Sequence, residues 1–290
     1  MKGIILAGGY GTRLHPLTLA VSKQLLPVYD KPMIYYPLSM LMLGNIREVL
    51  VISDPVHLPA FKRLLGRGEK LGMKFSYIEQ PEPCGLPEAF MLGSEFINGD
   101  PVSLILGDNI FFGHNLAKEL LISTNLTSGA QVFAYSVTNP GRYGVIELDS
   151  ERKPVSLEEK PENPKSNYAV PGLYFFDGKV VEYAQSLTPS ERGELEITDL
   201  LRVYLNAGTL KVRLLGRGVA WLDAGEPNAL LQAAQFIQAI EERQGMIVSS
   251  IEEIAYRRGF ITIDQLQRLV SELGANHYRD YLQRMIDEIK

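Results

Sequence analysis

The sequence predicts an α/β fold with a Rossmann-like, mixed and mostly parallel sheet flanked by helices, and two observations lead to this prediction. Short apolar runs of strand length alternate with segments of helical period through the first half of the 290-residue chain. The first apolar run also leads directly into a glycine-rich loop. Such alternation is typical of a sheet covered by helices on both faces, because parallel neighbours are joined by helical crossovers.

The expected elements follow from these runs in chain order. Buried strands are expected at residues 4–6, 49–52, 75–78, 104–106 and 132–135, and intervening helices at residues 33–43, 57–65, 86–97 and 114–124. Between residues 144 and 176, short strand-like runs separated by turns indicate a small antiparallel or mixed extension. Further helices are expected at residues 179–187 and 196–206, and a strand at residues 210–215.

The chain beyond residue 226 is expected to form several helices, with breaks at Gly245 and Gly259. Helices such as residues 228–243 carry apolar stripes, which suit either subunit contacts or packing on the chain's own core. We therefore expect a core domain of residues 1–225, with the extension at about residues 140–176, and a helical C-terminal region of residues 226–290.

Composition and charge restrict the class of protein. The chain is 46% hydrophobic and has a formal net charge of −5, so no broad basic surface indicates a nucleic-acid partner. Its single cysteine, Cys84, excludes an internal disulfide and suits a reducing compartment. No run approaches the ~20 apolar residues of a membrane span, and the apolar start is too short for a signal sequence. We expect a cytoplasmic protein with neither nucleic acid nor membrane as a partner.

The glycine-rich loop after the first strand is the most informative motif. Its glycines are Gly8, Gly9 and Gly11. Without a Cβ, such a loop lets backbone N–H groups approach phosphate oxygens, and Arg13 and Lys23 supply positive charge nearby. A dinucleotide fingerprint would need a glycine where Leu14 stands, which argues against a dehydrogenase, and the Walker pattern is absent. The nearby cations favour a polyphosphate site over a turn that needs glycine only for its geometry.

Two aspartates that follow apparent strands are candidate metal ligands. Asp108 follows the run at residues 103–106, and Asp223 follows Trp221 and Leu222. Mg²⁺ prefers oxygen ligands and is typically held by one or two carboxylates together with phosphates and water. In α/β sheets, ligands bind beyond the carboxyl ends of the strands, where Asp108 and the glycine-rich loop are expected. A lone aspartate more often caps a turn, so the surrounding motifs carry this interpretation.

These motifs together resemble those of the sugar nucleotidyltransferases, and the full set resembles the glucose-1-phosphate thymidylyltransferases. The matching blocks run in order from residue 3 to about residue 260. They include LAGGYGTRL at residues 6–14, SKQLLP at 22–27, KPMIYYPL at 31–38, GDNIFFG at 107–113, LEEKP at 157–161, SERGELEIT at 190–198, LGRG at 215–218 and WLD at 221–223. The first block is specific to the superfamily, and the set is specific to the narrower family.

The resemblance implies a reaction as well as a fold of the nucleotide-diphospho-sugar transferase type. The implied substrates are dTTP and glucose 1-phosphate, the products are dTDP-glucose and diphosphate, and the cofactor is Mg²⁺. The second pKa of a phosphate monoester is about 6, so the attacking phosphate is already ionised near neutral pH and needs no general base. The resemblance further implies a homotetramer, with feedback by a nucleotide sugar at a second site between subunits.

The resemblance also assigns site residues. The catalytic residues implied are Arg13, Lys23, Asp108, Lys160 and Asp223, with Asp108 and Asp223 as metal ligands. The nucleotide-binding residues implied are Gly8, Gly9, Gly11, Thr12, Arg13, Gln24, Gln80, Gly85 and Leu86. The sugar-phosphate-binding residues implied are Tyr143, Gly144, Glu159, Lys160, Val170, Tyr174, Arg192 and Trp221. Core packing is the alternative for Tyr174 and Trp221, and Lys31 is expected to have no task beyond solvation or a loop contact.

Departures from the family pattern leave alternatives open. Cys84 stands where the family usually has aspartate, and Pro87 and Glu88 stand where it has alanine and glutamine. This segment sets nucleotide preference, so a nucleotidyltransferase for UTP or for another sugar 1-phosphate is the nearest alternative. Pro171 and Ala224 are departures near the sugar pocket and the second aspartate. A non-catalytic nucleotide-sugar sensor is a further alternative, against which the retained cations and aspartates argue.

Overall fold

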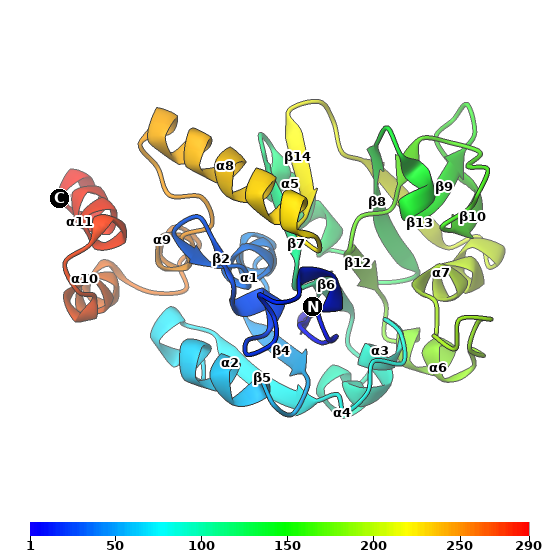
Figure 1. The fold of residues 1–290 in the computed structure, drawn as a ribbon, viewed down its shortest axis with the longest axis horizontal. Helices are drawn as coiled ribbons and strands as arrows, with labels where there is room; N and C mark the ends of the chain where they lie inside the picture. Colours follow the sequence, from blue (N-terminus) through cyan, green and yellow to red (C-terminus); the bar gives the residue numbers. More distant parts are fainter. Residues whose placement is uncertain (290) are drawn as a thin grey trace.

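A ten-stranded mixed sheet forms the centre of the computed structural model, which describes residues 1–289 (Figure 1). Its strands are β1 (Lys2–Leu6), β4 (Glu48–Ser53), β5 (Lys74–Glu79), β6 (Val102–Leu106), β8 (Ala130–Ser136), β9 (Gly144–Leu148), β10 (Pro154–Glu159), β11 (Tyr168–Ala169), β12 (Leu173–Phe176) and β13 (Leu210–Leu214). Their order is β10-β9-β11-β8-β12-β6-β1-β4-β5, with β13 paired to β8. The predicted α/β fold with a mixed sheet is therefore confirmed.

The strands β6, β1, β4 and β5 are parallel and form one half of the sheet. Alternate residues of β1 pack into separate cores on the two faces: Ile5 belongs to one hydrophobic cluster and Ile4 to the other. A strand buried on both faces must be apolar at every position, which explains the continuous run that the sequence shows here.

Helices cover both faces of the sheet. They are α1 (Tyr35–Leu43), α2 (Leu58–Leu65), α3 (Glu88–Leu92), α4 (Ser94–Ile97), α5 (Leu116–Ser123), α6 (Val180–Gln185) and α7 (Ile197–Asn206). Buried side chains of α1, α2 and α5 join the cluster of Ile5, whereas those of α3, α4, α6 and α7 join the cluster of Ile4. The single helix expected at residues 86–97 is wrong, because it is divided at Gly93. A Cβ there would lie 2.9 Å from the carbonyl oxygen of Ala89 and 3.1 Å from Leu50.

The antiparallel extension differs from the expectation at its C-terminal end. Strands β9 and β10 form an antiparallel pair as expected. Strand β12, expected as part of the extension, lies inside the main sheet and runs antiparallel between β6 and β8. Two strand pairs were not expected: β7 (Asn109–Gly113) with β14 (Val219–Asp223), and β2 (Pro27–Val28) with β3 (Lys31–Pro32). Short 3₁₀ turns are η1 (Thr12–Leu14), η2 (Lys23–Leu25), η3 (Glu69–Leu71) and η4 (Pro140–Arg142).

The C-terminal region consists of helices α8 (Pro227–Gln244), α9 (Ile251–Arg257), α10 (Ile263–Glu272) and α11 (His277–Ile289). Gly245 and Gly259 adopt φ values of 65° and 67° at the ends of α8 and α9, so both predicted breaks are confirmed. Helices α10 and α11 lie at the opposite end of the molecule from β9 and β10 (Figure 1). None of the helices within residues 1–289 has the length and apolar character needed to cross a membrane.

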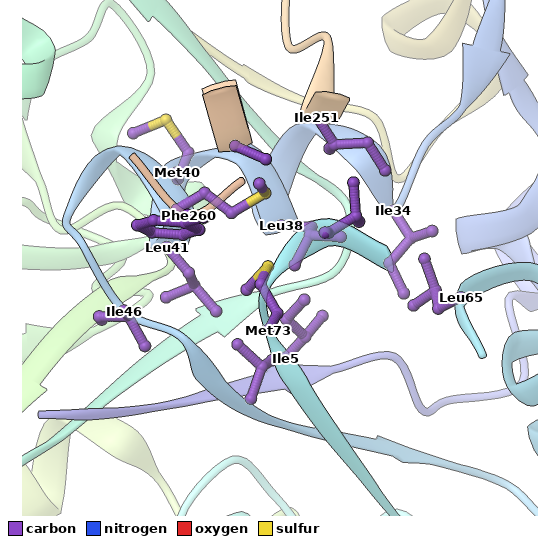
Figure 2. Packing of buried hydrophobic residues seen from close by; sticks show 14 of the residues in the cluster. Ile5, Ile34, Leu38, Met40, Leu41, Ile46, Leu65, Met73, Ile251 and Phe260 are labelled. Carbon is purple, nitrogen blue, oxygen red and sulfur yellow. The ribbon is translucent and has the colours of Figure 1, made fainter. Parts of the chain in front are cut away.

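The C-terminal helices complete the core beneath β1. Ile251 of α9 and Phe260 pack into the same hydrophobic cluster as Leu38 of α1 and Ile5 of β1 (Figure 2). Of the two interpretations of the apolar stripes, packing on the chain's own core is thus realised for α9, α10 and α11. Helix α8 lies beside β14 (Figure 1), with Ala233 and Ile237 in a third buried cluster.

Candidate active site

A cleft of about 540 Å³ opens at the carboxyl ends of β1 and β6. Its walls come from the loop after β1, the loop after β5, the ends of β6 and β10, the start of α7, and β14. Nearly all residues that the sequence singles out line it: Gly8, Gly9, Arg13, Lys23, Gln24, Gln80, Gly85, Leu86, Asp108, Tyr143, Gly144, Glu159, Lys160, Val170, Tyr174, Arg192, Trp221 and Asp223. Gly11 and Thr12 are not among its lining residues.

The glycine-rich loop has the backbone conformation that its glycines permit. Gly9 has a φ of 92° and faces open space, so a Cβ there would have no atom within 4 Å. Gly11 has a φ of 60° at the start of η1, and its carbonyl oxygen accepts a hydrogen bond from the Thr18 hydroxyl at 2.8 Å. Gly11 therefore shapes the turn, whereas Gly8 and Gly9 present backbone to the cleft.

Asp108 and Asp223 come together although 115 residues separate them in the chain. Asp108 follows β6 and precedes β7, and antiparallel pairing with β14 places Asp223 opposite Asn109. A Cβ on Gly225 would lie 3.1 Å from Asp223 Oδ1, 3.7 Å from Asp108 Oδ2 and 3.6 Å from Arg13 Nη2. Two carboxylate oxygens and a guanidinium thus lie around one point, the Cβ position of residue 225.

The electrostatics of the aspartate pair differ between its members. Burial opposes ionisation of Asp108, but Lys23 Nζ lies 2.5 Å from its Oδ2, and together with the hydrogen bond from Asn109 this lowers its pKa. Burial raises the pKa of Asp223, and the neighbouring charge of Asp108 raises it further. Lys23 and Arg13 oppose that rise. The charged form of Asp223 is therefore disfavoured in this environment, and a further cation beside it would stabilise that form.

The aspartate pair fits a divalent cation of the oxygen-binding kind. Mg²⁺ usually takes one or two protein carboxylates and completes its shell with water and substrate phosphates. Within residues 1–289, no group of three or more His, Cys, Asp or Glu side chains is arranged to hold a metal. The two carboxylates beside Gly225 match the coordination that Mg²⁺ usually has in proteins. Asp108 and Asp223 are the residues that would hold the ion.

The loop after β5 forms one end of the cleft. Gln80 is buried, and its Nε2 donates to Glu88 Oε2 at 2.6 Å. Gly85 has a φ of 111° and pairs with Leu195 in an isolated parallel bridge, where a Cβ would lie 2.1 Å from the Leu195 carbonyl oxygen. Gln24 is also buried, and its Oε1 accepts from the Ser22 hydroxyl at 2.6 Å. The Gln80 carboxamide is therefore held in one orientation, because a carboxylate can only accept, and the Gln24 carboxamide is hydrogen-bonded nearby.

Aromatic and charged groups form the other end of the cleft. The rings of Tyr143 and Trp221 lie 4.9 Å apart, and the Trp221 indole donates to Asn109 Oδ1 at 2.7 Å. Lys160 follows Glu159 with a φ of 42°, a backbone conformation that is unusual for a side chain with a Cβ and that recurs at functional sites. Its Nζ lies 3.3 Å from Glu159 Oε1. Tyr174 is almost fully buried on β12, and burial raises its pKa strongly.

Arg192 lies at the wall of the cleft, but its guanidinium is paired with protein carboxylates. Its Nη2 lies 2.7 Å from both carboxylate oxygens of Glu196 and 3.7 Å from Glu159 Oε1. The hydrogen bond with Glu196 raises the pKa of Arg192 despite the opposing effect of burial. A substrate phosphate would have to compete with Glu196 for this arginine.

Several cleft residues were missed by sequence reasoning. Asn109 bonds to three partners at once: its Oδ1 accepts from Trp221 and from the Gly172 backbone, and its Nδ2 donates to Asp108. Thr198 at the start of α7 has a buried hydroxyl oxygen without a hydrogen-bond partner among the described residues. Asn109 follows Asp108 directly and could have been inferred from that position, and Thr198 is the last residue of the matching block at residues 190–198, which supplied only Arg192 to the expected site.

Comparisons with known proteins agree with this geometry. The model of the family "Nucleotidyl transferase" matches residues 2–240. A glucose-1-phosphate thymidylyltransferase of Neisseria meningitidis is 54% identical over 286 residues, covering 99% of both chains. One of Mycolicibacterium smegmatis is 55% identical over 287 residues, again covering 99% of both chains.

Solved structures share the fold. A Bacillus anthracis protein described as a glucose-1-phosphate thymidylyltransferase, crystallised with sucrose, superposes with a TM-score of 0.76 at 41% identity, covering 81% of this chain and 94% of that one. A UDP-glucose pyrophosphorylase in complex with UDP-glucose has the same fold, with a TM-score of 0.73 at 24% identity, and covers 82% of this chain and 98% of its own.

The mixed sheet, the glycine-rich loop and the cation–carboxylate cluster at the strand ends define a nucleotidyltransferase. Sequence identity above 50% over nearly the whole chain shows the particular family within this class. The chain belongs to the glucose-1-phosphate thymidylyltransferase family.

Proposed function

We propose that the chain transfers a thymidylyl group from dTTP to α-D-glucose 1-phosphate and releases diphosphate. The observation that carries this proposal is the convergence of Arg13, Asp108 and Asp223 around Gly225, with Lys23 on Asp108, in a cleft that has a polar amide end and an aromatic end. A phosphate oxygen of the sugar attacks the α-phosphorus in line with the leaving diphosphate, and the bond to the diphosphate breaks. The names of the relatives from Neisseria meningitidis and Mycolicibacterium smegmatis agree with this reaction.

Positioning and charge neutralisation account for the catalysis proposed here. Nucleotidyl transfer demands little covalent chemistry from the protein, and the sugar phosphate needs no deprotonation near neutral pH. Arg13 and Lys23 neutralise the triphosphate and the charge that accumulates on the leaving diphosphate, which is often the largest catalytic contribution. The backbone of Gly8 and Gly9 approaches the phosphates from the loop side.

The metal proposed for this site is Mg²⁺. Asp108 and Asp223 would hold the ion, which supplies charge neutralisation and orients phosphate oxygens when it is bound. Lys23 is already paired with Asp108 and so places its positive charge beside the same phosphates.

The two ends of the cleft suit the two substrates. Gln24, Gln80, Gly85 and Leu86 are proposed to contact the nucleotide, because oriented amides can pair with a base edge. Lys160 is proposed to bind the sugar phosphate. Tyr143, Gly144, Glu159, Val170, Tyr174, Arg192 and Trp221 are proposed to surround the sugar. The unpartnered hydroxyl of Thr198 adds a hydrogen-bonding group at this end.

A substrate panel tests the proposal. Release of diphosphate is measured with Mg²⁺ for dTTP, UTP, dCTP and dATP, each with glucose 1-phosphate and with galactose 1-phosphate. The highest kcat/KM is expected for dTTP with glucose 1-phosphate. Equal or better turnover with UTP would replace the proposed nucleotide, and absence of turnover with every pair would favour a nucleotide-sugar sensor.

We also infer from the family resemblance a cytoplasmic homotetramer with feedback at a second nucleotide-sugar site. A second cavity of about 250 Å³ between α1, α5 and α9 offers room away from the active site, and Arg257 and Arg258 are among its lining residues. Light scattering tests the tetramer. The feedback is tested by inhibition with a dTDP-sugar. An inhibition that is not competitive with dTTP supports a second site.

A further inference from the structure

Glu88 joins two parts of the loop that forms the polar end of the cleft. It is the first residue of α3, and its Oε2 accepts from Gln80 Nε2 at 2.6 Å and from the Cys84 backbone N–H at 3.1 Å. Gln80 lines the cleft, whereas Glu88 is not among the cleft-lining residues. Glu88 therefore acts on the cleft only through the groups that it holds.

The hydrogen bond to Glu88 fixes the orientation of the Gln80 carboxamide. A carboxylate can only accept hydrogen bonds, so the Gln80 NH₂ group must face Glu88, and a flipped amide would bring two oxygens together. The Gln80 oxygen then faces the glycine-rich loop, where a Cβ on Gly8 would lie 2.5 Å from it. Because an NH₂ group has two protons, one N–H remains to donate beside this fixed acceptor.

We propose that Glu88 is a positioning residue that makes the site select pyrimidines with an imide edge, thymine or uracil, against cytosine. This inference rests on the proposed function, in which Gln80 contacts the base. An imide offers a ring N–H donor next to a carbonyl acceptor, which pairs with the oxygen and the N–H of the fixed Gln80. In the pose that uses the carbonyl at ring position 4, cytosine would set its acceptor ring nitrogen against the fixed Gln80 oxygen and its amino group against the Gln80 N–H, and would need the flipped carboxamide that Glu88 prevents.

The test compares kcat/KM for dTTP and dCTP, with glucose 1-phosphate and Mg²⁺, in wild type and three variants. In Glu88→Met the acceptor is lost, and the dTTP preference is expected to fall about tenfold or more, because one misplaced hydrogen-bonding pair discriminates on that order. The change should appear in KM, with kcat for dTTP within about threefold of wild type, because Glu88 touches no reacting atom. Glu88→Gln should keep most of the preference, since its amide oxygen can still accept from Gln80.

Glu82→Met is the matched control, because Glu82 is exposed on the same loop and bonds to neither Gln80 nor Cys84. The preference of Glu82→Met for dTTP over dCTP should equal that of wild type. If Glu88→Met does not unfold cooperatively, Glu88→Ser, whose side chain is too short to reach Gln80, replaces it in the same comparison. A folded Glu88→Met or Glu88→Ser with the wild-type preference overturns the inference, as does a Glu88→Gln that is as unselective as Glu88→Met. Failure of wild type to use dTTP would instead overturn the proposed function.

Discussion

At the residue scale, the site is organised by the way in which each charge is balanced. Lys23 neutralises Asp108, whereas Asp223 has only the more distant Lys23 and Arg13. Arg13 is largely exposed and lies 3.7 Å from Glu226, so its guanidinium is held near the carboxylates without being buried. Two cations thus accompany two carboxylates, but Asp223 has no ion-pair partner within 4 Å among residues 1–289, which suits a site that receives a metal together with a polyphosphate.

Replacing Asp108 tests this charge balance. In Asp108→Asn, turnover is expected to fall about a hundredfold or more, because one of the two proposed metal ligands loses its charge where charge stabilisation dominates catalysis. The fold should persist, because the amide oxygen can still accept from Lys23. Diphosphate release and far-UV circular dichroism are the measurements. Asp149→Asn, in the turn between β9 and β10, is the control and should keep full activity. A wild-type rate for Asp108→Asn would show that the metal assignment is wrong.

Motif residues were predictable at this scale, and their partners were not. Gly8, Arg13 and Asp108 stand in contiguous strings whose composition indicates phosphate chemistry, and all three line the cleft. The bond between Gln80 and Glu88 joins residues that lie eight positions apart across a turn, so no local pattern reveals it. The pairing of Arg192 with Glu196 was equally hidden, because the choice between phosphate and carboxylate depends on how the loop folds.

At the scale of elements, the β2–β3 hairpin is attached to α8 by a buried lysine. Lys31 is 3% exposed, its Nζ lies 3.0 Å from Glu241 Oε1, and it also bonds to Asp30. The same nitrogen lies 5.1 Å from the centre of the Tyr36 ring. The expectation that Lys31 has no task beyond solvation or a loop contact is therefore wrong. Sequence separation hid the partner, since Glu241 lies 210 residues away.

Removing this lysine should weaken the fold. Lys31→Met leaves Glu241 buried without its counter-charge, and breaking a buried ion pair in this way costs about 3 kcal/mol or more of the free energy of unfolding. Urea denaturation gives the value. The double variant Lys31→Met, Glu241→Met should recover part of the loss, because well-packed apolar residues replace the pair. Lys70→Met, which removes an exposed ion pair with Glu272, should cost less than about 1 kcal/mol.

The stability lost in Lys31→Met should also depend on pH. Burial raises the pKa of Glu241, and Lys31 opposes that rise while Asp30 adds to it. A carboxyl whose pKa is raised on folding contributes stability below its unfolded value of about 4.3, and this stability is lost as the pH rises through the folded value. Without Lys31, the pKa of Glu241 in the folded state rises further. The deficit of Lys31→Met should therefore be larger at pH 7.5 than at pH 4.5, and a deficit independent of pH would contradict this account.

The elements themselves were predictable where one periodicity dominates. The apolar run of β1 and the glycine breaks after α8 and α9 follow from local composition. The pairing of β7 with β14 was not predictable, because polar and apolar residues alternate too weakly within residues 109–113. The partner strand also lies more than 100 residues later in the chain. The place of β12 inside the main sheet depends on its antiparallel neighbours β6 and β8, which no local pattern specifies.

At the scale of the whole molecule, the C-terminal helices share a core with the α/β sheet. Buried side chains of α9, α10 and α11 belong to the same cluster as β1, α1 and α2. Hydrogen bonds from Tyr278 and Tyr281 to Glu252 and Glu253, at 2.5 Å and 2.6 Å, join α11 to α9. The boundary expected at residue 226 therefore separates segments of the chain without separating their hydrophobic cores.

A shared core predicts cooperative unfolding of the subunit. Differential scanning calorimetry should give one transition for residues 1–290, with a calorimetric enthalpy close to the van't Hoff enthalpy per cooperative unit. A chain ending at Gly245 should lose solubility or unfold at a much lower temperature, because the apolar surface around Leu38 and Ile34 becomes exposed. A separate early transition that disappears on truncation would contradict the prediction.

The backbone bridge between Gly85 and Leu195 has a consequence for the two loop segments that it joins at the cleft. The Leu195 N–H donates to the Cys84 carbonyl at 2.8 Å and ties the segment after β5 to the segment that bears Arg192, so neither can shift alone without breaking this contact. A change in one of these segments is therefore expected to displace the other. The bridge leaves no room for a side chain at Gly85, where a Cβ would lie 2.1 Å from the Leu195 carbonyl oxygen.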